Sequence, residues 1–406
     1  MKGMPCIFYM YFTYSTPIPS LTVIVQTRTP LLLETVMPRP FTRLHEPWAF
    51  VRHFTPNWFA MTMGTGVMAL VLAALPWDFP ARLLLAEAVW GLALLLFALF
   101  TLLFTARLLL FRDTVRPMLE HPVQSMFLGA IPMGLVPIIN GLPLFLGEAA
   151  VPLAHALWWL DVALALGAAF GVPYLMFTRQ QHALERLTGV WLLPIVAPGV
   201  AAGAAGLLAP HLPAAAAQLV VIVGYVLWGL SLSLAVGLIT LVLLRLALHK
   251  LPDTDFAATS WLPLGPLATG CLGLLTLGQA APQAWQGTPL AGMAELAQQL
   301  GLVGGLALWG AGLWWLVAAS LFTHHYIRRE LPFNLGWWGF TFPLGVFTLA
   351  TLALYRQFGV ELFGLFGVVL AVKLALIWQL VLRRTLQGLW HGELFRAPCL
   401  ASQACR

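Results

Sequence analysis

Glycine and proline residues recur inside five apolar segments of this chain, and the chemistry they offer is that of exposed backbone. The segments begin at Phe54, Met126, Gly189, Trp261 and Trp337, and none of them contains Asp, Glu, Lys or Arg. Proline removes a helical hydrogen bond, and glycine lets other groups approach the backbone. Free N–H groups and helix N-termini attract negative charge without a fixed cation. This pattern indicates weak, distributed contacts with a small anion, and weak contacts permit fast release.

The five segments read as copies of one unit, because each carries Gly at a matching place, and four of the five carry Pro there as well. Gly and Pro also serve packing in membrane helices, but their strict alternation with uninterrupted apolar segments favours a pathway wrapped by an outer wall. We expect Phe59 and Asn140 to line the pathway; Asn140 either contacts the passing anion or hydrogen-bonds to a neighbouring helix. The matching positions, which we also expect to line it, are Gly64, Gly66, Pro132, Gly134, Pro198, Gly199, Pro266, Gly270, Pro343 and Gly345.

The helices that carry these segments must lie in a membrane. The chain has 406 residues, of which 60% are hydrophobic and only 9% are charged, whereas ordinary globular domains carry about 25% charged residues. A spanning helix needs about 20 apolar residues, and the sequence supplies ten such stretches, so we expect an all-α integral membrane protein. The odd-numbered spans carry the Pro and Gly residues and are expected inside, with the even-numbered spans outside, as five helical hairpins. The expected spans are 54–75, 82–111, 123–146, 151–177, 188–208, 213–248, 261–281, 293–321, 334–355 and 360–387.

The positive charge of the chain lies mostly on one face of this ten-span arrangement. The formal net charge is +6, but Arg and Lys flank the loops of one face and both termini, while only Arg82 and Arg356 lie on the other face. This asymmetry follows the positive-inside rule. It does not suit a nucleic-acid surface, so we expect a cell-membrane protein with both termini in the cytoplasm. The expected regions are an N-terminal arm over 1–50, disordered or an over-extended start, a membrane domain over 51–390 and a short tail over 391–406.

No cluster of residues points to catalysis, a cofactor or a metal. The chain has neither the GxxxxGK[ST] phosphate loop nor the HExxH zinc motif. A zinc site would need more ligands than His324 and His325 supply, and the four cysteines lack the spacing of a zinc site or a disulfide framework. We therefore expect no enzyme and no cofactor, with a small anion and the lipid bilayer as partners.

The ordered set of segments resembles one known family. The resemblance rests on FTPNWFAMTMGTGVMAL at 54–70, HPVQSMFLGAIPMGLVPIIN at 121–140, WLLPIVAPGVAAGAAG at 191–206, WLPLGPLATG at 261–270 and WWGFTFPLGVFTLAT at 337–351. Together they look like the tellurite-resistance/dicarboxylate transporter (TDT) family, which includes fungal malate permeases, fungal sulfite efflux pumps and plant slow anion channels. The MGTG, PMG with IIN, and WWGFTFP forms are closest to the malate and sulfite branch.

The resemblance implies ten helices in five hairpins around a pseudo-five-fold central pore, usually in a homotrimer. It also implies that a Phe on the ninth span closes the pore. By position this residue is Phe342, with Phe340 as the alternative two residues away. An aromatic ring can block a narrow channel and swing aside at modest rotamer cost.

Two transport mechanisms remain open from the residues alone. The first is a passive or weakly coupled conduit for a C4-dicarboxylate such as malate, or for sulfite. The alternative is proton-coupled secondary transport of the same anions by alternating access. A carboxylate near the middle of the membrane would favour coupling, and the uncharged Pro and Gly spans disfavour it.

Overall fold

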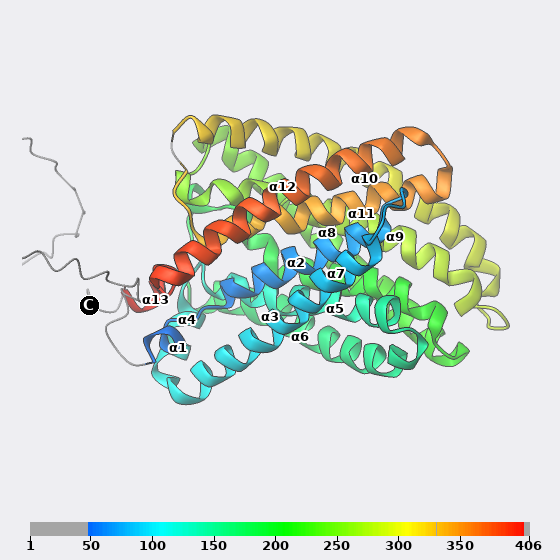
Figure 1. Ribbon diagram of the computed structural model, residues 1–406, viewed down its shortest axis with the longest axis horizontal. Coiled ribbons are helices and arrows are strands. Elements are labelled where there is room, and N and C mark those ends of the chain that lie inside the picture. Colours follow the sequence, from blue (N-terminus) through cyan, green and yellow to red (C-terminus); the bar gives the residue numbers. More distant parts are fainter. Residues whose placement is uncertain (1–47, 330, 402–406) are drawn as a thin grey trace, which may run out of the picture. The chain divides into compact units, whose positions relative to one another are not determined.

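Ten long helices make up most of the described chain, which in this computed structural model comprises residues 48–329 and 331–401. All ten are long and apolar enough to cross a membrane, so the predicted number of spans is confirmed (Figure 1). No strand occurs within the described ranges. The long helices are α2 (Phe59–Ala74), α3 (Arg82–Leu110), α5 (Ala130–Leu146), α6 (Val151–Thr178), α7 (Leu192–Leu208), α8 (Ala214–His249), α9 (Leu264–Ala284), α10 (Ala294–Ile327), α11 (Thr341–Phe358) and α12 (Glu361–His391). The short helices are α1 (Ala49–Arg52), α4 (Val115–Glu120) and α13 (Pro398–Ala401).

Several span boundaries differ from the sequence-based expectation. The seventh span begins at Thr254 and the eighth continues to Ile327. The ninth continues to Phe358, so Arg356 lies on a helix and not in a loop. The expected N-terminal arm falls almost wholly outside the described residues, as do residues 402–406 of the expected tail.

The ten spans fall into two sets by burial. In the spans that carry Pro and Gly, 72% to 94% of the apolar stretch is buried, against 28% to 33% in the others. We call α2, α5, α7, α9 and α11 the buried helices, and α3, α6, α8, α10 and α12 the exposed helices. Each buried helix packs against two others, in the closed cycle α2–α5–α7–α9–α11–α2, and each also packs against the exposed helix that follows it in the chain. The Pro and Gly pattern therefore coincides with the buried set.

A stretch of 3-10 helix lies just ahead of each buried helix. In α5, α7, α9 and α11 the third α-helical residue is a proline: Pro132, Pro194, Pro266 and Pro343. Proline is tolerated there because the first four N–H groups of a helix have no partner within it. These four prolines therefore lie in the first turn of their α-helix, which continues beyond them. In α7 the matching proline is Pro194, and the predicted Pro198 lies four residues further along the helix.

Each exposed helix donates one indole hydrogen bond to a buried helix. The acceptor lies on the next buried helix in the chain, and for α12, the last exposed helix, it lies on α2. A buried indole N–H needs an acceptor, and here each finds one on a neighbouring helix. We call these five bonds the tryptophan ties. They are Trp90 to the Ile138 carbonyl (3.3 Å), Trp158 to the Ala201 carbonyl (2.9 Å), Trp228 to the Gly270 carbonyl (2.9 Å), Trp309 to Thr351 Oγ1 (2.9 Å) and Trp378 to Thr65 Oγ1 (3.2 Å). The last tie joins the tenth span to the first and so closes the cycle.

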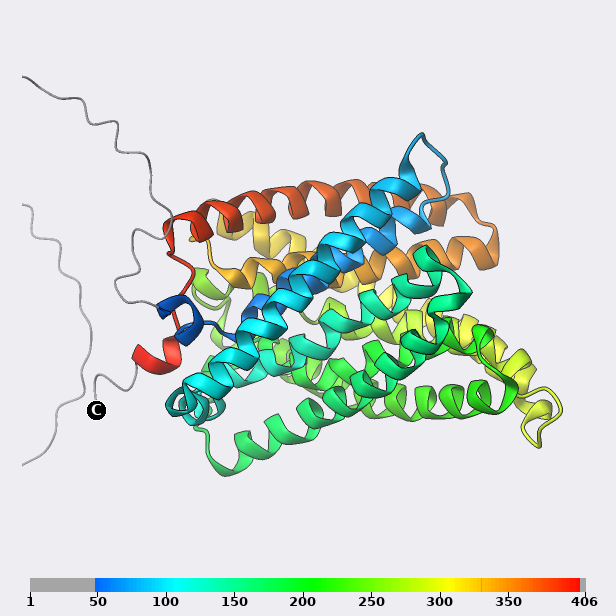
Figure 2. The same ribbon diagram turned by 60° about the horizontal axis from the view of Figure 1, so that its bottom comes forward.

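The first and last described segments lie at the same end of the helical bundle. Figures 1 and 2 both show α1 and α13 beside each other there. The Phe395 ring lies 5.3 Å from the Trp58 ring and 6.3 Å from the Phe50 ring, measured between centroids. An even number of membrane crossings requires this arrangement.

Candidate functional site

Three cavities follow one another between the buried helices. The wide cavity has a volume of about 590 Å³ and is lined by residues near the C-terminal ends of the buried helices. The middle cavity and the third cavity have volumes of about 40 Å³ each. The third cavity is lined by the first turns of the buried helices and by the 3-10 segments ahead of them.

A ring of five side chains lies at the boundary between the wide and middle cavities. Each buried helix contributes one residue that lines both. Four of the five are leucine, and only one offers a polar group. We call this set the leucine ring; it consists of Leu70, Asn140, Leu207, Leu272 and Leu349. An apolar constriction of this kind resists wetting and opposes the passage of ions.

Phe342 lies at the boundary between the middle and third cavities. Its side chain lines both of them and is only 4% exposed. Phe342 is the second residue of α11. The second residues of α2, α7 and α9, which are Ala60, Leu193 and Gly265, also line the third cavity. Equivalent positions of four helices therefore face one space, and Phe342 is the largest side chain among them.

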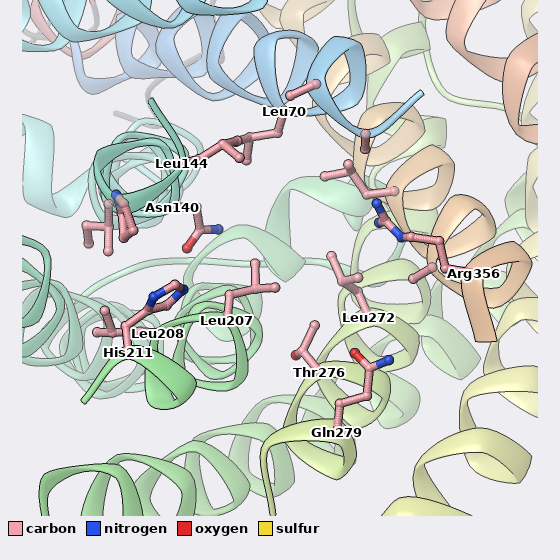
Figure 3. A pocket seen from close by; sticks show the side chains of 16 residues that line it. Leu70, Asn140, Leu144, Leu207, Leu208, His211, Leu272, Thr276, Gln279 and Arg356 are labelled. Carbon is pink, nitrogen blue, oxygen red and sulfur yellow. The ribbon is translucent and has the colours of Figure 1, made fainter. Parts of the chain in front are cut away.

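The wide cavity carries five polar side chains. Arg356 comes from α11, Thr276 and Gln279 from α9, Asn140 from α5, and His211 from the 3-10 turn after α7. Figure 3 shows the guanidinium of Arg356 and the amides of Asn140 and Gln279 directed toward the open space.

Two of these five groups are already engaged. Thr276 Oγ1 donates to two backbone carbonyls, at 3.1 and 3.3 Å. His211 Nδ1 lies 2.7 Å from Glu148 Oε1. The other three polar side chains make no hydrogen bond or ion pair with any residue that the structure describes. Their donors remain free to contact a solute in the cavity.

Sequence reasoning missed Arg356 as a site residue. The expected ninth span ended at residue 355, which left Arg356 in a loop. The signal that could have found it is Gly359, which follows α11 in the left-handed conformation with φ 65°. Glycine in that conformation is a common end of a helix, so the helix could have been extended to it.

The predicted glycines lie mostly where two helices touch. Gly64 and Gly345 lie at the contact between α2 and α11, and Gly66 and Gly134 at the contact between α2 and α5. A Cβ at any of the four would overlap an atom of the neighbouring helix, so glycine permits close packing here. Gly270 accepts the tie from the exposed helix α8.

Four of the predicted residues line the cavities. Asn140 lines the wide and middle cavities, Gly199 the middle one, Phe342 the middle and third, and Pro343 the third. Their part in transport stays a prediction, as does that of the remaining positions. The predicted prolines outside these three linings are Pro132, Pro198 and Pro266.

Phe59 and Phe340 also lie outside the three linings. The Phe59 ring packs edge-on against three phenylalanine rings of α3, at centroid distances of 5.5 to 6.1 Å. The Phe340 ring lies 5.8 Å from that of Trp261 and 5.9 Å from that of Trp337, edge-on to both. Phe340 thus has aromatic neighbours on two sides, whereas Phe342 lies between two voids.

The electrostatics of the three cavities favour negative charge. None of their lining residues in the described part of the chain is Asp or Glu. Within the same residues, no three His, Cys, Asp or Glu side chains could together hold a metal ion. A cavity lined by one arginine and neutral donors has a positive potential that attracts anions.

These features define a class: a multi-pass, all-α membrane protein whose internal cavities suit a small anion. The chain belongs to the SLAC1 family of voltage-dependent anion channels, whose family model matches residues 53–386. The predicted family is thereby confirmed, and the relatives described next match the predicted malate and sulfite branch.

The curated relatives are transport proteins. A sulfite efflux pump of Arthroderma benhamiae is 37% identical over 365 residues, which cover 87% of this chain and 96% of the pump. A sulfite efflux pump of Saccharomyces cerevisiae is 26% identical, with 76% and 81% covered. The malic acid transport protein of Schizosaccharomyces pombe is 25% identical, with 82% and 77% covered. Family and relatives indicate that this chain transports an anion across a membrane.

Proposed function

We propose that this protein carries sulfite, or a C4-dicarboxylate such as malate, across the cell membrane through the three cavities. The relatives named for sulfite and malic acid support these two substrates. An anion entering from the wide cavity would meet the leucine ring and then the ring of Phe342. In this proposal the buried helices surround a pseudo-five-fold pore, and the exposed helices separate it from lipid.

The observation that carries the proposal is the place of Phe342, which among the described residues is the one that lines both small cavities. Its ring closes the path, and the voids on either side give it space to turn between rotamers. Pro343 follows directly and is the third residue of α11, where a backbone N–H would have no partner within the helix. The proline therefore removes no helical hydrogen bond beside Phe342.

Reconstituted flux tests the substrate. Purified protein in lipid vesicles should take up sulfite or malate faster than chloride or nitrate, relative to vesicles without protein. Uptake driven by the anion gradient alone should continue when an ionophore collapses the pH gradient, because no acidic side chain lines the path within the described residues. Flux that stops without a pH gradient would favour the proton-coupled alternative, and no flux of any anion would contradict the proposal.

Replacing the gate residue should open the path. Phe342→Ala should raise the flux about tenfold, which corresponds to removing roughly 1.4 kcal/mol from the barrier. The variant should still elute as folded protein, because the ring borders voids and loses fewer contacts than a fully packed one. The measurement is the initial rate of sulfite or malate uptake per reconstituted protein.

Phe340→Ala is the matched control, since it removes the same ring two residues away. Phe340 packs edge-on against two tryptophans, so its truncation should cost about 3–5 kcal/mol of stability and leave the flux of the folded fraction unchanged. Unchanged flux in well-folded Phe342→Ala would show that the gate lies elsewhere. Raised flux in Phe340→Ala alone would move the gate to that residue.

A further inference from the structure

Arg356 extends into the wide cavity without a counter-ion. Its side chain comes from the last turn of α11 and points into the open space (Figure 3). Within the described residues it makes no hydrogen bond or ion pair. Three acidic side chains at this end of the bundle, Glu148, Glu361 and Asp78, each bond another residue, at 2.7, 3.2 and 3.3 Å. None of these three neutralises Arg356.

Further donors face the same space. The amides of Asn140 and Gln279 point into the cavity from α5 and α9, and each offers two N–H groups. Arg82 lies beside the cavity as well, because its Nη1 donates to the carbonyl of the lining residue Ala73 at 2.6 Å, but its charge is paired with Asp78 at 3.3 Å. Donors from three buried helices thus face one cavity, and none of them bonds a described residue.

We propose that Arg356, with the amides of Gln279 and Asn140, forms a binding site for an oxyanion at the wide end of the pathway. The ligand class is an anion with at least two oxygens on one carbon or sulfur atom. This inference rests on the proposed function and deepens it, since it names the residues that bind the cargo in the wide cavity and at its border with the leucine ring.

The guanidinium explains the choice of an oxyanion over a halide. Its planar fork of N–H groups bonds two oxygens of one group at once, which a spherical chloride cannot match. Sulfite and the carboxylates of malate share this arrangement of oxygens. The site also lies next to the constriction where an anion must shed water, so bound donors there replace part of the hydration shell.

Two substitutions separate the effect of the positive charge of Arg356 from the effect of its planar fork of N–H groups. Arg356→Gln removes both, and Arg356→Lys keeps the charge as a point without the planar fork. In vesicles, Arg356→Gln should raise the half-saturating concentration of sulfite or malate about tenfold, the usual effect of losing a charge-assisted hydrogen bond. Arg356→Lys should also leave the half-saturating concentration of the oxyanion raised, and it should reduce the preference for the oxyanion over chloride. Separate sulfite and malate series show which of the two the site holds.

Arg384→Gln is the matched control, because it removes the same charge from an exposed residue near the other end of the bundle. It should leave the half-saturating concentrations of sulfite and of malate unchanged. An Arg356→Gln variant that saturates like the wild type would overturn the inference. So would an Arg356→Lys variant with full oxyanion preference, because a point charge would then suffice.

A binding measurement keeps this inference separate from the proposed function. Sodium sulfite or sodium malate should raise the thermal unfolding midpoint of the detergent-purified wild type and of Arg384→Gln, but not of Arg356→Gln. If the wild type transports nothing yet shows this shift, the proposed transport fails and the site stands. If the wild type transports and Arg356→Gln shows the same shift as the wild type, the site fails and the transport stands.

Discussion

Asn140 is the polar member of an otherwise apolar ring. Its amide points toward the open space in Figure 3 and bonds none of the described residues. The sequence left two roles open for it, contact with the anion or a bond between helices, and this placement supports the first. Within the leucine ring, the amide of Asn140 is therefore the one side-chain group to which an anion that sheds its water can form a hydrogen bond.

Closing the ring with a fifth leucine should therefore slow transport. Asn140→Leu removes the amide with little change in size, and an anion at the constriction would lose one hydrogen bond from a neutral donor. We expect the uptake rate to fall about tenfold, because a hydrogen bond from a neutral amide to an anion is charge-assisted by the charge of the anion. The variant should fold, because the amide makes no bond that the packing needs. The measurement is sulfite or malate uptake at saturating concentration.

The reverse exchange serves as the control. Leu349→Asn places a second amide in the same ring, on α11, and should raise the uptake rate. A lower rate in Leu349→Asn, or an unchanged rate in Asn140→Leu, would show that the leucine ring does not limit the flow of anions.

At the scale of the helices, the five tryptophan ties fix how the buried helices sit against the exposed ones. The tie from Trp378 to Thr65 spans 313 residues of sequence, and Thr65 is completely buried. This bond holds the tenth span against the first. Without it, the contact between α2 and α12 would depend on packing alone in the described part of the chain.

A double-mutant cycle can measure this tie. Trp378→Phe and Thr65→Val should each lower the thermal unfolding midpoint, and the pair together should lower it by less than the sum. The expected coupling is about 0.6 to 1.7 kcal/mol, the range found for hydrogen bonds between membrane helices. Trp314→Phe is the control, because that indole is exposed, and it should show no coupling to Thr65→Val. Additive effects of Trp378→Phe and Thr65→Val would mean that the tie adds no stability.

The sequence predicts the helices better than it predicts the site. The lengths of the apolar segments suffice to predict the ten spans, and the segments with Pro and Gly coincide with the buried set. Both patterns follow from the bilayer as solvent. Pro198 was matched to the other prolines in place of Pro194 because spacing alone does not show where a helix begins. Arg356 was missed because its place depends on where α11 ends. The leucine ring arises from packing between distant segments, which no local pattern encodes.

At the scale of the whole molecule, the distribution of charge predicts the orientation in the membrane. Both described ends of the chain lie at one end of the bundle (Figure 2). Arg383 and Arg384 lie on the last turns of α12 toward this end, and Arg and Lys concentrated beside membrane spans mark the cytoplasmic side. The wide cavity, at the opposite end, would then open away from the cytoplasm. The same orientation is expected for each copy in the predicted homotrimer.

Reporter fusions test this orientation. Between the loop at Gly287 and residue 390 lie the three spans α10, α11 and α12, so the two points must face opposite sides of the membrane. A reporter that is active only in the cytoplasm should work when fused after residue 390 and fail when inserted at Gly287, and a reporter active only outside should give the reverse. Equal activity at both points would contradict the ten-span topology. Activity in the opposite sense would keep the topology and turn the wide cavity toward the cytoplasm, which would make Arg356 the residue that meets an anion leaving the cell.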